Sequence, residues 1–176
     1  MTGLFFLALI KRRNDIADIG WGIGFIGVAL FNLLTGSVTF ASLAVTVLII
    51  IWGMRLAVHI HARNRGKQED FRYKKWREEW GKWFLIRTYL QVFLLQGVLM
   101  LLISLPIIFV AHHYASSIQW LIPVGIFVWT FGFIFESVGD AELAAFIRNP
   151  VNKGTILQSG LWRYTRHPNY FGEVTQ

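Results

Sequence analysis

The sequence predicts an all-α fold, a polytopic membrane bundle of four to five transmembrane helices. Hydrophobic residues make up 55% of the 176-residue chain, 15% of the residues are charged, and the mean hydropathy is +0.48. A soluble domain is typically about a quarter charged. Apolar runs near the roughly 20 residues that a helix needs to cross a bilayer recur along the chain. Backbone polar groups in lipid must be satisfied within their own segment, so these runs are expected to be helices.

Five apolar runs define the expected helices. Met1–Ile10 is a short first membrane helix rather than a secretory signal, because its basic residues follow the apolar run. Four longer runs follow in order: Ala17–Thr35, Val38–Met54, Leu85–Val110 with a kink at Pro106, and Trp120–Phe135, which continues as a polar helix. No repeat or linker divides the chain, so residues 1–176 are expected to form a single membrane domain.

The distribution of basic residues predicts the orientation. The loops Gly36–Ser37 and Ala111–Gln119 contain none of the 17 Lys and Arg residues. The positive-inside rule therefore predicts a multi-pass membrane protein whose polar segments face the cytoplasm. Trp52, Trp83 and Trp120 fall near expected span ends, where tryptophan anchors lie. The net charge of +7 is dispersed between apolar runs, which argues against a nucleic-acid partner.

A cluster of glycines in the first long run predicts close helix packing. Gly22, Gly24 and Gly27 spell G-x-G-x-x-G, but a dinucleotide fingerprint must follow a strand and open a helix, and this one lies inside a membrane span. Gly20 and Gly24 also form G-x-x-x-G, which lets two helices approach closely. We therefore expect a packing role and not a soluble cofactor fold.

Four polar residues in the first half are candidates for catalysis. Asp15 and Asp18 lie at the mouth of a span, where they either cap the helix or face the bundle as functional carboxylates. Arg55 and His59 share one helix face at the edge of an apolar run, where they either snorkel or serve a function. No cysteine is present and the histidines lack further ligands, so no metal site is predicted. The cations from Arg72 to Arg77 are expected to meet membrane lipids.

A polar region near the end of the chain predicts an anion site. Pro168 disfavours helix at His167 and suits the first turn of a new helix, so a helix should start near Pro168 or Asn169. Arg163, Arg166 and His167 crowd against that start, where free N–H groups and the helix dipole favour a phosphate or carboxylate. A basic stretch touching anionic lipid is the alternative.

Two acids and two tyrosines complete this region. Glu136 and Asp140 lie one turn apart on the continuation of the last span, either as a partner for a cation or hydroxyl group or as a solvated face. Tyr164 and Tyr170 could stack on a flat ring.

The motif SGLWRYTRHPNYFGE, with FESVGDAELAAFIRNP and KGTILQSG before it, resembles the membrane steroid 5α-reductase superfamily, and most closely its bacterial DUF1295 family. RNDIADIGWG and RLAVHIHARNRGKQEDFRY resemble that family as well, so the likeness covers nearly the whole chain. The R-H-P-x-Y-x-G core is also similar to sterol reductases, which use NADPH, and to isoprenylcysteine carboxyl methyltransferases, which use S-adenosylmethionine.

The resemblance implies an all-helical fold with a cofactor cavity open to the cytosol. It implies that the NADPH site is lined by two sets of residues: Glu136, Asp140, Arg148 and Asn169, and, around the pyrophosphate and nicotinamide, Tyr164, Arg166, His167 and Tyr170. The family's glutamate–tyrosine proton-donor pair has no match here, and Asp15, Asp18, Arg55 and His59 are the available substitutes. Family members continue past the Gly-Glu pair into further membrane helices, which implies that the chain is incomplete at its C-terminus.

The expected function is reduction by NADPH of a C=C bond in a lipophilic, steroid-like or lipid-like enone. Two alternatives stay open at this point. The first is a membrane methyltransferase of the isoprenylcysteine carboxyl methyltransferase type that uses S-adenosylmethionine. The second is a non-catalytic membrane protein with a degenerate site.

Overall fold

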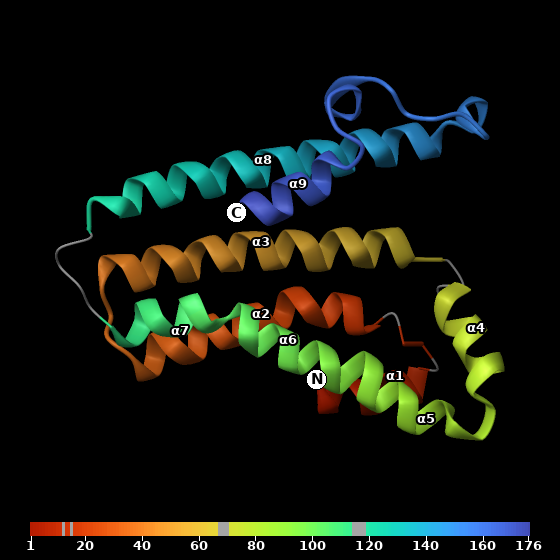
Figure 1. Ribbon diagram of the computed structural model, residues 1–176, viewed down its shortest axis with the longest axis horizontal. Helices are drawn as coiled ribbons and strands as arrows, with labels where there is room; N and C mark the ends of the chain where they lie inside the picture. The colour runs from red at the N-terminus through yellow and green to blue at the C-terminus, as the bar shows by residue number, and fades with distance from the viewer. Residues whose placement is uncertain (12, 15, 67–70, 114–118) are drawn as a thin grey trace. The chain divides into compact units, whose positions relative to one another are not determined.

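The computed structural model confirms the all-α fold, with 84% of the described residues in helices and no strand among them (Figure 1). The structure describes every residue except 12, 15, 67–70 and 114–118, and leaves out the side chains of residues 71 and 74. The chain divides into two compact units, Met1–Tyr114 and Ala115–Gln176, which are described separately below.

The first unit, Met1–Tyr114, is a bundle built on a helical hairpin. Its elements are α1 (Thr2–Lys11), α2 (Ile16–Thr35), α3 (Phe40–Asn64), α4 (Phe71–Trp80), the 3-10 turn η1 (Gly81–Trp83), α5 (Phe84–Arg87), the π-helical segment η2 (Thr88–Leu94), α6 (Leu95–Ile103) and α7 (Leu105–His112). A short turn joins α2 to α3, so these two helices are antiparallel neighbours (Figure 1).

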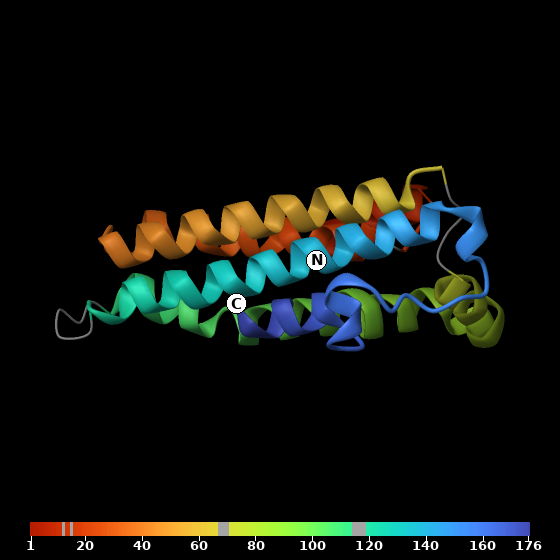
Figure 2. The same ribbon diagram turned by 90° about the horizontal axis from the view of Figure 1, so that it is seen from above.

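The second unit, Ala115–Gln176, consists of one long helix with a short helix folded back along it. The long helix is α8 (Leu121–Arg148), and the short one is α9 (Pro168–Thr175). Two 3-10 turns lie between them, η4 (Pro150–Asn152) and η5 (Gly160–Arg163). Both views show α9 alongside α8 (Figures 1 and 2). The start of α9 at Pro168 confirms the prediction made from the proline.

Four helical stretches are long and apolar enough to cross a membrane, so this is a membrane protein. They are Ile16–Thr35, Phe40–Asn64, Lys75–Ile103 and Leu121–Arg148. The apolar run predicted as Val38–Met54 lies in α3, which begins at Phe40 and continues to Asn64, so Arg55 and His59 lie on one helix, as predicted. The predicted third span is divided, because the helix breaks at Ser104 before Pro106, whose ring cannot continue the preceding ladder of hydrogen bonds.

The hairpin of α2 and α3 is held at a backbone contact between Gly22 and Gly53. A methyl group added to Gly53 would lie 2.7 Å from the carbonyl oxygen of Gly22, and one added to Gly22 would be closer still to the carbonyl oxygen of Gly53. The glycines of the predicted G-x-x-x-G pattern face other neighbours, since Gly20 meets Leu4 and Gly24 meets the end of Met100. Close helix packing at these glycines is therefore confirmed, and the contact of backbone with backbone is made by Gly22.

An aromatic cluster attaches α4 to the rest of the first unit. Tyr73 is 4% exposed and packs with Val92 and the fully buried Phe93.

Trp52 was predicted as an interface anchor, but it lies in the middle of α3 with its ring centre 5.6 Å from that of Phe25. It is therefore part of the contact between α2 and α3.

We predict that Gly22→Ala destabilises the protein by about 1–3 kcal/mol, because the new methyl group must displace the backbone of α3. Gly27→Ala is the matched control in the same helix, since its added methyl group meets nothing within 4 Å. That control should be neutral or stabilising by up to about 1 kcal/mol, through helix propensity. Thermal unfolding of both variants in detergent checks this, and equal midpoints would contradict the packing described.

Candidate functional site

The second unit is held together by a backbone contact between α8 and α9. A methyl group added to Gly132 would lie 2.7 Å from the carbonyl oxygen of Gly172, and one added to Gly139 would lie 3.0 Å from the backbone nitrogen of Asn169. Pro168 is fully buried against Gly139. These contacts fix the position of the start of α9 along α8.

A carboxylate on α8 fixes the first polar side chain of α9. The Oδ1 atom of Asp140 accepts a hydrogen bond from Nδ2 of Asn169 at 3.0 Å. A carboxylate only accepts, so the nitrogen of the Asn169 amide must face Asp140 and its oxygen must point elsewhere. That oxygen is buried and has no partner among the described residues. It is an acceptor available to a donor group of a ligand.

A second carboxylate lies one turn earlier, deeper between the helices. Glu136 is 3% exposed and accepts a hydrogen bond from the side-chain amide of Gln176. Glu136 and Asp140 therefore share a face, as predicted, and that face packs against α9. The alternative of a solvated face does not hold at Glu136.

The segment that leads into α9 is attached to α8 at two points. The backbone N–H of Leu161 donates to Oε2 of Glu142 at 3.0 Å, and the indole Nε1 of Trp162 donates to the carbonyl oxygen of Gly139, also at 3.0 Å. Gly160 has φ of +57°, and a side chain there would run into Glu142. Sequence reasoning missed these contacts, although the Ser-Gly turn before Leu161 marked where the chain reverses.

The predicted cations are exposed on this attached segment. Arg163, Arg166 and His167 are all exposed, and no carboxylate of the described residues lies within ion-pair distance of either arginine. The His167 ring centre lies 5.2 Å from that of Tyr170, which is 61% exposed. Tyr164 is 82% exposed. The surface at the start of α9 thus carries uncompensated positive charge beside accessible rings.

Arg148 is not brought to this group. It ends α8 and is exposed. Eight residues separate it from Asp140, which is about 12 Å along a helix axis.

The candidate catalytic residues lie on the first unit. Asp18 is half-buried in the first turn of α2, and Arg55 and His59 are half-buried on α3. Asp18 lies one turn before Gly22 on α2, and Ala57 lies one turn after Gly53 on α3. Because the two helices are antiparallel and touch at these glycines, Asp18 is level with Ala57. Ala57 lies between Arg55 and His59 along α3. The structure therefore brings these three candidates to one height of the hairpin. Asp15 lies outside the described residues.

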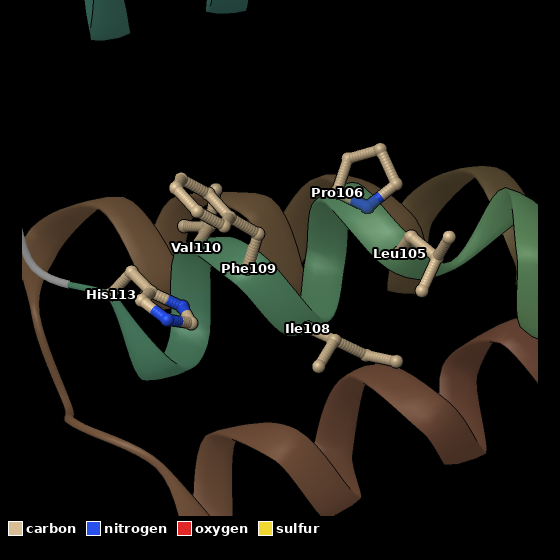
Figure 3. A pocket seen from close by; sticks show the side chains of 6 residues that line it. All are labelled: Leu105, Pro106, Ile108, Phe109, Val110 and His113. Atoms are coloured by element: carbon tan, nitrogen blue, oxygen red, sulfur yellow. The ribbon is translucent and has the colours of Figure 1, made fainter.

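An open hollow of about 490 Å³ lies on α7, also in the first unit, and differs from the cationic surface in chemistry. Figure 3 shows its lining side chains projecting from the helix in several directions rather than enclosing a space. They are Leu105, Pro106, Ile108, Phe109, Val110 and His113. The His113 ring stacks on Phe109 with centres 4.6 Å apart. No charged group is present there to hold a coenzyme phosphate.

No cluster of three or more potential metal ligands occurs in the part of the chain that the structure describes. No curated protein and no solved structure matched the chain. One family model matched it, over residues 4–176, which is almost its whole length. The motifs at the start of α9 and along α8 lie inside that match, and the chain therefore belongs to the family described as protein of unknown function (DUF1295).

Proposed function

We propose that this protein is a membrane-embedded reductase that holds NADPH at the start of α9 and reduces the C=C bond of a lipophilic enone. The observation that carries the proposal is the pair of uncompensated arginines, Arg163 and Arg166, on a segment hydrogen-bonded to α8. Exposed cations on a mobile tail would bind any anion weakly. Cations on an attached segment beside the start of a helix are already positioned, so they can bind one particular anion without first being ordered.

The ligand chemistry of the second unit suits a dinucleotide. Arg163, Arg166 and His167 would bind phosphate oxygens, together with the first-turn N–H groups of α9. The buried oxygen of Asn169 accepts from a donor, and NADPH offers ribose hydroxyls and a carboxamide N–H. The exposed ring of Tyr170 could stack on an adenine or nicotinamide ring.

The proposed reaction also needs a proton, and the candidate residues for supplying it lie in the first unit. NADPH, when bound, supplies a hydride, and saturation of the enone requires one proton in addition. Asp18 and His59 have the chemistry to donate a proton or to polarise a carbonyl oxygen, and Arg55 has the chemistry to stabilise negative charge on such an oxygen. The half-buried position of these three residues suits a substrate that arrives from the bilayer. The cofactor side would face the cytoplasm, in keeping with the distribution of Lys and Arg.

We predict that Arg163→Gln and Arg166→Gln each weaken NADPH binding by about tenfold to a hundredfold, because each removes a charge-assisted hydrogen bond of about 1.5–3 kcal/mol. Lys153→Gln, which removes the same charge from an exposed turn, should leave affinity within about twofold. Calorimetric titration of the purified protein with NADPH measures this.

Parallel titration with S-adenosylmethionine separates the alternatives. Binding of S-adenosylmethionine but not NADPH would replace the reductase by the methyltransferase. Binding of neither would favour a non-catalytic protein.

We predict that Gly160→Ala weakens NADPH binding and speeds amide exchange at Leu161, because the added methyl group collides with Glu142 and breaks the hydrogen bond to Leu161. Gly154→Ala is the matched control. Gly154 also has positive φ, at +83°, so both variants carry the cost of about 1–2 kcal/mol for a left-handed residue, but its added methyl group meets nothing within 4 Å. Equal effects of the two changes would show that the attachment to Glu142 does not position the cations.

A further inference from the structure

Three cations surround the junction of α4 and α5 in the first unit. Arg77 near the end of α4, Lys82 in η1 and Arg87 at the end of α5 are all exposed. The Arg77 guanidinium lies 4.3 Å from the centre of the Phe84 ring, and Arg87 follows Phe84 by three residues, which places it on the same side of the helix. We name Arg77, Lys82 and Arg87 the cationic corner.

Exposed apolar side chains begin at the same place. Trp83 is 54% exposed, and Leu85 and Ile86 are each 53% exposed. They open the apolar part of the spanning stretch Lys75–Ile103. Figure 1 shows α4 running across the direction of α3 and α6, with α5 beginning where α4 ends. A change from cations to exposed tryptophan and aliphatic groups within a few residues is typical of the boundary between headgroups and hydrocarbon.

The corner is attached to the bundle and keeps an excess of positive charge. Tyr73 is buried in a cluster with Val92 and Phe93, and Trp76 packs against the same cluster, so α4 is attached by its aromatic side. Of the two acids on α4, Glu79 is paired with Lys75 at 3.6 Å and so offsets a cation outside the corner, and Glu78 is exposed beside Arg77. Among the described residues of α4, η1 and α5, the three corner cations therefore stand against one acid. The cations therefore meet their ligand without first ordering the helix.

We propose that the cationic corner binds the headgroup of an anionic phospholipid, with the lipid phosphate among Arg77, Lys82 and Arg87 and the acyl chains along Trp83 and Leu85. The corner combines charges for a phosphate with apolar surface for the attached chains, and a free anion would use only the first of these. A neutral phospholipid would gain the apolar contacts and less of the electrostatic attraction. The interaction is independent of the coenzyme and of the proposed reductase activity.

The test compares anionic and zwitterionic lipid on the intact, detergent-purified chain. Phosphatidylglycerol or phosphatidylcholine is titrated into the micelles, and bound lipids are counted by native mass spectrometry while the thermal midpoint is followed. We expect phosphatidylglycerol to bind more tightly and to raise the midpoint further. Replacing all three corner cations by Gln should weaken phosphatidylglycerol binding on the order of 100-fold, since each cation near an anionic headgroup contributes about fivefold. Phosphatidylcholine binding should change by less than about threefold.

Two controls separate this site from general charge and from misfolding. The triple variant Arg63→Gln, Arg65→Gln, Lys75→Gln loses the same charge outside the corner and should keep its preference for phosphatidylglycerol. The double variant Arg77→Lys, Arg87→Lys retains charge and should recover most of the binding. Equal loss in the corner and control triple variants, or equal binding of the two lipids by the unaltered chain, would overturn the proposal. So would competition by free glycerol phosphate at the concentration at which the lipid binds.

Discussion

Contact between glycine backbones is the interaction on which both units depend. Lipid tails are as apolar as the side chains of a membrane helix, so burying apolar surface does little to draw two such helices together, and close packing must do so. In the first unit this packing occurs where Gly22 meets Gly53, and in the second where Gly132 meets Gly172. The second contact has the larger functional consequence. It sets the height of α9 on α8, and thereby decides which residues of the two helices can reach each other.

Polar pairs between α8 and α9 make that height specific. A buried polar group without a partner costs about 1–3 kcal/mol in a protein interior, so a slip of α9 by one turn along α8 would be penalised at several atoms at once. Asp140 would lose Asn169, and Glu136 would lose Gln176. Glycine packing permits the two helices to touch, and the acid–amide pairs select one register. The exposed segment before α9 is held in the same register, because the indole N–H of Trp162 donates to the carbonyl oxygen of Gly139 on α8.

Local chemistry could be predicted from the sequence, and contacts between distant residues could not. The start of α9 at Pro168 follows from a missing N–H and a restricted preceding residue, both visible in a few letters. The apolar run stops at Met54, but the four-residue spacing of Arg55 and His59 predicted a helix there too, and α3 continues through both residues to Asn64. A glycine pattern predicts a close approach without naming its partner, so Gly22 could not be matched to Gly53. The bond from Leu161 to Glu142 spans 19 residues and leaves no periodic trace.

The positive charge of the candidate site at the start of α9 follows from what its acidic residues contact. The second unit carries cations and acids close together in sequence, and a random arrangement would pair them with one another. Instead Asp140 accepts from an amide and Glu142 accepts from a backbone N–H, so both carboxylates are occupied by neutral donors. Arg163 and Arg166 then have no acid among the described residues within ion-pair distance. Since an acid engaged by a neutral donor does not cancel a neighbouring cation, the fold leaves a positive surface at the start of α9, where the helix dipole adds to it. The same hydrogen bonds that order the segment therefore also leave its positive charge uncancelled, which is what the proposed anion site requires.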